Sequence, residues 1–170
     1  TKTVSKKSEY RIANNSINDF DLFFLKEENN GKNKVYSPLS IKYALAMLKE
    51  GASGNTKEQI SSVVGDYKFK KYSNSKNLSL QNVLFVKNSY KQNINENYIN
   101  LIKDKYNSNV FYDDFASASN INSWVSENTF KQINDLFLDS DINNKDFLLG
   151  NALAIDMEWV NKIQSENKEY

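Results

Sequence analysis

Two acidic stretches of this 170-residue chain place carboxylates close together. Asp113 and Asp114 are adjacent and lie beside aromatic residues, a combination that acid–base catalysis can use. Neighbouring residues of a strand point to opposite faces of a sheet, so we do not expect these two carboxylates to act on one substrate. Segment 139–150 starts like a calcium loop, but Asn144 and Gly150 stand where that loop needs Gly and Glu. The favoured interpretation is a solvated acidic turn.

Two further segments contain residues that could bind phosphate or nucleic acid. Segment 51–57 superficially resembles a phosphate loop, but its spacing is wrong and it follows a predicted helix where a strand is required. We interpret it as a corner between two helices. Segment 67–72 alternates aromatic residues with Lys, as proteins that bind single strands do. A formal net charge of +1 and a single Arg, Arg11, argue against a nucleic-acid partner.

Cys and His are both absent from the chain. Their absence excludes a disulfide, a thiolate nucleophile and a His-based triad within this sequence. We therefore expect no enzyme activity, no catalytic residue, no metal site and no cofactor. No apolar run approaches the roughly 18 residues of a membrane span, and no signal peptide is visible at the start.

The hydrophobic pattern predicts helices joined by strands in one α+β domain without a linker. Ser37 is expected to cap a helix that Pro38 begins and Gly51 closes, and Thr56 with Gln59 forms a capping box for the next helix. Segment 66–77 leaves room for at most two helical turns. The other helices are predicted over about 12–28 (starting at residue 8 or 12), 95–106 and 119–137, and the strands over 34–36, 78–88, 109–115 and 147–160.

Four blocks, in this order, resemble the serpins, protease inhibitors that insert a loop into their own sheet. The first block covers residues 36–60, with Tyr-Ser-Pro-Leu-Ser-Ile and the two predicted helices that follow. The second is the strand at 78–85, in which Gln81 stands where the family has Ala. The third and fourth are Ile-Asn-Ser-Trp-Val at 121–125 and Asn-Ala-Leu at 151–153. The similarity spans roughly residues 12–161. It implies the N-terminal portion of a serpin fold: helices A to F with strands of sheet A, and helix D shortened or absent. Residues 1–170 would then be the N-terminal part of one serpin domain, with the reactive loop and C-terminal half absent.

The resemblance also implies roles for particular residues. Ser37, Ser40 and Asn151 would lie in the shutter beneath sheet A, and Trp159 at the breach, where the loop first enters. Trp124 would lie on helix F, which covers the sheet. From the residues alone, Ser37 is an ordinary helix cap and Trp159 an ordinary core aromatic.

The function implied is inhibition of serine or cysteine proteases by insertion of the cleaved reactive loop into sheet A. The implied partners are the target protease and the C-terminal half of the same serpin, without nucleic acid or a membrane span, and the implied location is extracellular or at the cell surface. Segment 154–158 departs from the family, because Ala-Ile-Asp-Met-Glu replaces a run with Lys and Gly. A non-inhibitory serpin-like binding or structural protein is therefore the alternative.

Overall fold

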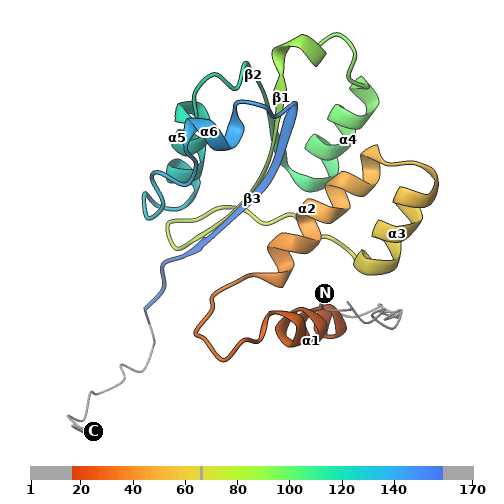
Figure 1. Cartoon of the computed structure of the whole chain (residues 1–170). Helices are drawn as coiled ribbons and strands as arrows, with labels where there is room; N and C mark the ends of the chain where they lie inside the picture. Colours follow the sequence, from red (N-terminus) through yellow and green to blue (C-terminus); the bar gives the residue numbers. More distant parts are fainter. Residues whose placement is uncertain (1–16, 66, 159–170) are drawn as a thin grey trace, which may run out of the picture.

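The computed structural model describes residues 17–65 and 67–158 (Figure 1). A three-stranded sheet lies between two groups of helices. The elements, in chain order, are α1 (Ile17–Glu28), α2 (Pro38–Gly51), α3 (Gly54–Val64), β1 (Leu78–Lys87), the short 3-10 helix η1 (Asn88–Tyr90), α4 (Glu96–Tyr106), β2 (Ser108–Asp113), α5 (Ser119–Asn128), α6 (Asp139–Ile142) and β3 (Phe147–Ile155).

The sheet has the strand order β2-β1-β3, with β1 parallel to β2 and antiparallel to β3. Alternate residues of β1 enter different hydrophobic cores. Leu80 and Leu84 pack with residues of α2 and α4, whereas Val83 and Phe85 pack with residues of α5 and α6. Because both faces of β1 are covered, this strand is buried over most of its length.

The N-terminus of α2 forms as the sequence predicts. Ser37 has an extended backbone, and its Oγ accepts a hydrogen bond from the Ser40 N–H at 3.2 Å. The end of α2 and the start of α3 differ from the prediction. Gly51 is still helical, and Ala52 caps α2 through its N–H. Helix α3 begins at Gly54 without a side-chain cap, so the capping box predicted at Thr56 and Gln59 is wrong.

Helix α5 is much shorter than the predicted helix over 119–137. It ends at Asn128, where Phe130 and Lys131 adopt positive φ angles of 53° and 61°. The Lys131 N–H donates to the Ser126 carbonyl at 2.8 Å, which is the bond that a Schellman motif uses to close a helix. Consequently Ile133 and Leu136, predicted to continue the apolar stripe, are exposed.

Three other predicted elements also differ. Residues 34–36 form no strand, and Val35 is fully exposed because no neighbouring strand pairs with it. The predicted strand over 109–115 ends at Asp113, and Phe115 follows it with a φ of 55° and a buried ring. The predicted strand over 147–160 ends at Ile155. The acidic segment that starts at Asp139, predicted as a turn, contains the short helix α6.

The segment between α3 and β1 carries no helix over residues 67–77, in line with a shortened or absent helix D. Its Phe69 ring packs edge-on against Tyr43 and Tyr106, 4.8 Å and 5.3 Å between ring centroids. The Tyr43 hydroxyl donates to the Lys70 carbonyl. These contacts direct Phe69 into the core, so this ring is not available to stack on a nucleic-acid base.

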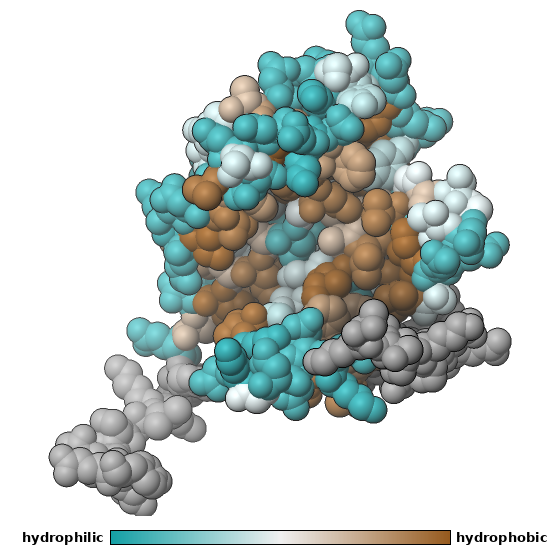
Figure 2. Space-filling view, in the orientation of Figure 1, coloured by the Kyte–Doolittle hydropathy of each residue, from teal (hydrophilic) through white to brown (hydrophobic). Residues whose placement is uncertain are grey.

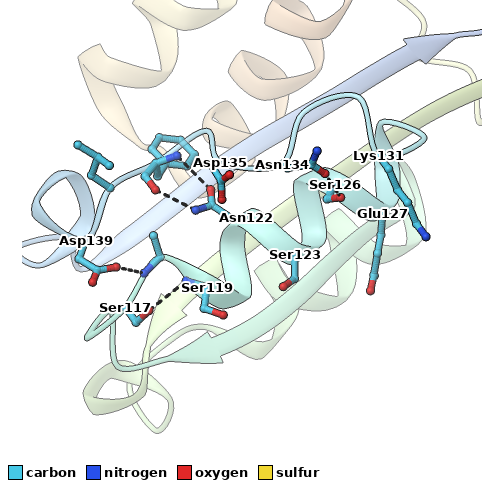
Figure 3. A pocket seen from close by; sticks show the side chains of 13 residues that line it. Ser117, Ser119, Asn122, Ser123, Ser126, Glu127, Lys131, Asn134, Asp135 and Asp139 are labelled. Carbon is cyan, nitrogen blue, oxygen red and sulfur yellow. Dashed lines mark hydrogen bonds between the residues drawn. The ribbon is translucent and has the colours of Figure 1, made fainter.

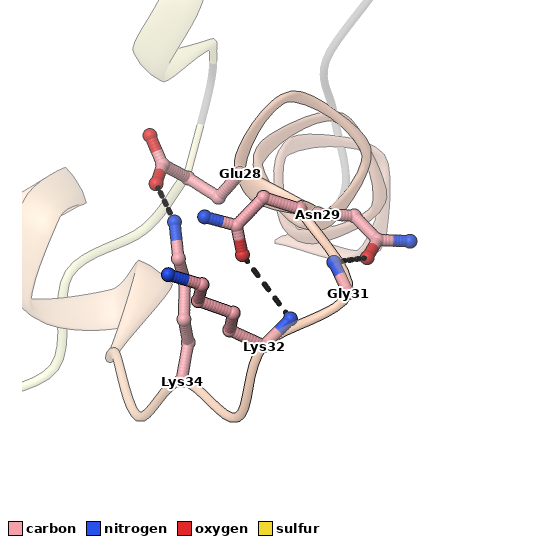
Figure 4. A network of polar contacts seen from close by, with 6 residues as sticks. Glu28, Asn29, Gly31, Lys32 and Lys34 are labelled. Carbon is pink, nitrogen blue, oxygen red and sulfur yellow. Dashed lines mark hydrogen bonds and ion pairs between the residues drawn. The ribbon is translucent and has the colours of Figure 1, made fainter.

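Two groups of contacts fix α1 beside α2. In the connecting turn, Lys34 pairs with Glu28 at 2.7 Å, and two Asn side chains accept backbone N–H groups (Figure 4). Inside, the Lys42 Nζ lies 5.1 Å from the centroid of the Phe20 ring and 5.2 Å from that of Tyr67. Cation–π attraction therefore places a lysine at the junction of three segments.

Within residues 17–65 and 67–158, no helix is long and apolar enough to cross a bilayer.

Candidate functional site

Two asparagines interrupt the apolar face of the sheet that contacts α2 and α4. Asn82 of β1 and Asn151 of β3 are register partners, and the Asn151 Nδ2 donates to the Asn82 Oδ1 at 2.7 Å. The Asn82 Nδ2 in turn donates to the carbonyl of Tyr106, the last residue of α4, at 2.7 Å. Since Asn82 is only 1% exposed, this chain of bonds links two strands and a helix without help from water.

Three buried side-chain oxygens, on Asp21, Ser40 and Asn151, have no hydrogen-bond partner among the described residues. The Asn151 Oδ1 and the Ser40 Oγ are both buried and make no hydrogen bond with the described part of the chain. A buried amide or hydroxyl oxygen without a partner typically costs about 1–3 kcal/mol. Each atom could therefore accept a hydrogen bond from a further polar group.

The outer edge of β3 also lacks a partner strand among the described residues. The Lys87 N–H donates to the Asp146 carbonyl, and the Asp156 N–H donates to the Asn77 carbonyl, so the even-numbered positions of β3 exchange bonds with β1. The odd-numbered positions direct their N–H and C=O groups outward; they are Phe147, Leu149, Asn151, Leu153 and Ile155. These main-chain groups can pair with one additional strand.

The side of α2 nearest this edge is apolar and incompletely covered. Ile41, Ala44, Leu45 and Leu48 recur at helical spacing, and none of them is fully buried. Figure 2 shows a broad hydrophobic area across the middle of this face, over α2 and along β3. An apolar helix stripe beside an open strand edge is typical of a surface that packs against further polypeptide.

The opposite face of the sheet is covered by α5. Trp124 is 7% exposed, and its Nε1 donates to the Asn109 Oδ1 of β2 at 3.1 Å. The segment after α5 is held by Asn122, whose side chain donates to the Phe137 carbonyl at 2.8 Å and accepts the Phe137 N–H at 3.0 Å (Figure 3). A polar cavity of about 720 Å³ separates α5 from this segment.

Trp159, which the resemblance assigns to the breach, lies outside the described residues.

The acidic residues considered as ligands or catalysts have structural partners. The Asp139 Oδ1 accepts the Ala118 N–H at 2.7 Å, and the Asp141 Oδ2 accepts the Leu138 N–H at 2.8 Å. Asp113 is buried at the end of β2, whereas Asp114 follows the strand and is exposed. In the described part of the chain, no group of three or more acidic side chains is arranged to hold a metal ion.

One charged cluster supports α4 against the end of α2. Burial opposes ionisation of the Glu50 carboxyl, but hydrogen bonds from Lys105 and Tyr106, at 2.7 Å and 2.8 Å, lower its pKa below the usual value. Burial and the neighbouring Glu50 raise the pKa of Tyr106 above the normal range. The ionised carboxylate and the neutral phenol therefore stabilise the same arrangement.

Comparison with known proteins now identifies the family. The sequence model described as Serpin (serine protease inhibitor) matches residues 16–170. The chain belongs to the serpin family. Human Serpin B4 is 32% identical, with 87% of this chain and 47% of that protein covered. The leukocyte elastase inhibitor of Xenopus tropicalis is 33% identical, with 87% and 45% covered.

The fold agrees with this assignment. The structure of a loop C-sheet serpin polymer superposes with a TM-score of 0.72 at 27% identity, covering 93% of this chain and 46% of that one. The chain therefore spans less than half the length of the serpins it matches. The predicted N-terminal portion of a serpin fold is confirmed, including the partial sheet flanked by helices.

The assignment of Ser37, Ser40 and Asn151 to a shutter stays a prediction. Asn151 and Ser40 both contribute a buried atom without a partner, whereas Ser37 acts as a helix cap. Sequence analysis assigned no role to Asn82, although it belongs to the serpin-like block at 78–85. A buried polar residue in the middle of an apolar strand was the signal that could have singled it out.

Proposed function

We propose that residues 1–170 form the N-terminal part of a single serpin domain, in a protein that inhibits serine or cysteine proteases. The observation that carries this proposal is the open edge of β3, together with an apolar stripe of α2 that the described residues cover only in part. A further segment of the same domain would pair with β3 and cover this stripe. The cleaved reactive loop, which the resemblance assigns to that further part, would then insert as an additional strand beside β3.

The proposed reaction starts in the protease. Its nucleophile attacks a peptide bond of the reactive loop and forms an acyl-enzyme, while the new amino terminus leaves. Insertion of the loop into the sheet makes main-chain hydrogen bonds that the native form lacks, and moves the attached protease until its active site is distorted. This chain supplies the sheet edge and no nucleophile, so we propose that it acts as an inhibitor and not as an enzyme.

The polar residues beneath the sheet would allow the edge to change partners. The Asn151 Oδ1 and the Ser40 Oγ offer hydrogen-bonding capacity that an arriving segment can use. We assign Ser37, Ser40 and Asn151 to the shutter, Trp159 to the breach and Trp124 to helix F. An extracellular or cell-surface location stays a prediction from the family.

The test uses the full-length protein that contains this chain. It is mixed with a panel of serine and cysteine proteases, and covalent complexes are sought on denaturing gels. Loss of the complex after blocking the protease nucleophile is the matched control. If no protease in a broad panel forms an SDS-stable complex, the inhibitory proposal fails.

The second candidate is a non-inhibitory serpin-like binding protein. It is favoured by the end of β3, where the strand stops at Ile155 and is followed by the exposed acidic residues Asp156 and Glu158. Exposed acids at this end would oppose insertion of an apolar loop. Thermal unfolding separates the two candidates, because cleavage of the reactive loop raises the melting temperature greatly only if the native form stores strain.

A further inference from the structure

A small cavity lies between α5 and the outer strand β2, on the opposite side of the sheet from the open β3 edge. Four aromatic residues line it: Phe85, Phe111, Tyr112 and Trp124. Phe85 and Phe111 are stacked with their centroids 5.2 Å apart and an interplanar angle of 29°, and Trp124 closes the α5 side. Phe111 is 42% exposed, so one wall of the cavity is an aromatic ring open to solvent.

The charged residues that line this cavity are all acidic: Asp113 of β2 and Glu127 of α5. Asp113 is 8% exposed; one oxygen accepts the Phe115 N–H and the other the Asn120 amide, both at 2.7 Å. A carboxylate has about four acceptor positions, so each oxygen can accept one more donor. Lys87 lies next to Asp113 in the strand register, but its Nζ is within 3.9 Å of Asp146, on the β3 side.

The second carboxylate, that of Glu127, is open to solvent. Glu127 is exposed, and Figure 3 shows the Ser123 and Glu127 side chains leaving α5 on the same side. Helix α5 lines the cavity with side chains spaced three or four residues apart, as on one flank of a helix. They are Asn120, Ser123, Trp124 and Glu127. One flank of the helix therefore presents a ring, polar groups and a negative charge to the same space.

The size of the cavity limits its occupant. Its volume of about 240 Å³ lies below the roughly 300–1,000 Å³ of sites for drug-sized ligands and cofactors. A single long side chain is of the right size. A guanidinium group is planar, stacks on aromatic rings and donates to carboxylates, so it matches both the walls and the charge.

We propose that the slot between α5 and β2 is a docking site for an arginine side chain of a partner protein. The guanidinium stacks on Phe111 and donates to Asp113 and Glu127. The slot uses neither the β3 edge nor the shutter residues, although it shares Trp124 with the proposed helix F.

The experiment titrates the full-length protein with N-acetyl-arginine methylamide and, separately, with the citrulline analogue. Citrulline has nearly the same shape but no charge. Binding is followed by NMR through the indole N–H signal of Trp124, which is assigned by its loss in Trp124→Phe. We expect a saturable shift with the arginine compound that weakens as salt is added, and no saturable shift with the citrulline compound.

Two variants test the walls of the slot. Phe111→Leu and Glu127→Gln should each weaken arginine binding roughly two- to fivefold, the range expected for one exposed cation–π or charge contact. The matched controls are Tyr90→Leu, an aromatic residue with similar exposure (44%) that does not line the slot, and Glu58→Gln on α3. Because Glu127 is exposed, its variant should fold even if Phe111→Leu does not.

Three results would overturn the proposal: no saturable shift with the arginine compound, equal shifts with both compounds, or equal weakening by Glu127→Gln and Glu58→Gln. None of these results bears on the protease complex, which is measured separately.

Discussion

Replacing Asn82 by Ala should be among the most damaging single changes in the sheet. The variant removes the bond to the Tyr106 carbonyl and the bond from the Asn151 amide, both 2.7 Å long. It leaves these two groups without a partner in a region where Asn82 itself is 1% exposed. Each buried group left without a partner costs about 1–3 kcal/mol, so the expected loss in the free energy of unfolding is about 2–6 kcal/mol.

The loss is measured on the full-length protein by urea unfolding, followed by far-ultraviolet circular dichroism, with refolding curves as the check on reversibility. Asn77→Ala is the matched control. The Asn77 side chain also donates to a carbonyl, that of Asp156, but the bond lies at the surface, so its loss should cost less than about 1 kcal/mol.

A double-variant cycle with Asn151→Ala tests whether the two side chains interact directly. Because they share one buried bond, the double variant should lose about 1 kcal/mol less than the sum of the two single losses. Strictly additive losses, or an Asn82→Ala loss no larger than that of Asn77→Ala, would refute the role given to Asn82.

Three further predictions use the same unfolding assay. Ser37→Ala should cost about 1 kcal/mol because it removes a helix cap, whereas Ser53→Ala should cost almost nothing, since Ser53 makes no capping bond; equal losses would contradict this. Burial raises the pKa of the Tyr43 hydroxyl from 10.0 to about 12, so its contribution to stability is complete below pH 10 and is lost as the pH rises through about 12. Tyr43→Phe should flatten this part of the alkaline profile, and an unchanged profile would exclude Tyr43 as its source. Trp124→Phe should cost about 1–2 kcal/mol through the lost bond to Asn109 and reduced packing, and a smaller loss would show that the ring alone suffices.

Local signals in the sequence were sufficient for several elements. The Ser37-Pro38 pair fixes the start of α2, because a hydroxyl next to a proline satisfies the first turn without help from the rest of the chain. Asn95 caps α4 in the same way, and the apolar spacing of Tyr98, Ile102 and Tyr106 predicts that helix. The serpin-like blocks added the family, which the comparisons confirm.

Tertiary structure decided where α5 ends and what α2 buries. No glycine marks residue 130, yet Phe130 takes the left-handed conformation that closes the helix. Of the apolar face predicted for α2, Met47 is fully buried but Ile41, Leu45 and Leu48 are not. Lys42 and Tyr43, outside that face, are fully buried beside α1 and the segment that follows α3. Such outcomes depend on which segments meet in space, and hydrophobic periodicity alone does not encode that.

The sequence by itself determined the cap at Ser37, the strand β1 and the family, because each depends on residues close together in the chain. Only the tertiary structure paired Asn82 with Asn151, which are 69 positions apart, and left one edge of β3 open. The arginine slot likewise needs β2 and α5 side by side. The physical reason is that hydrogen-bond partners and cavity walls are fixed by strand register and packing across the sheet, which no local pattern specifies.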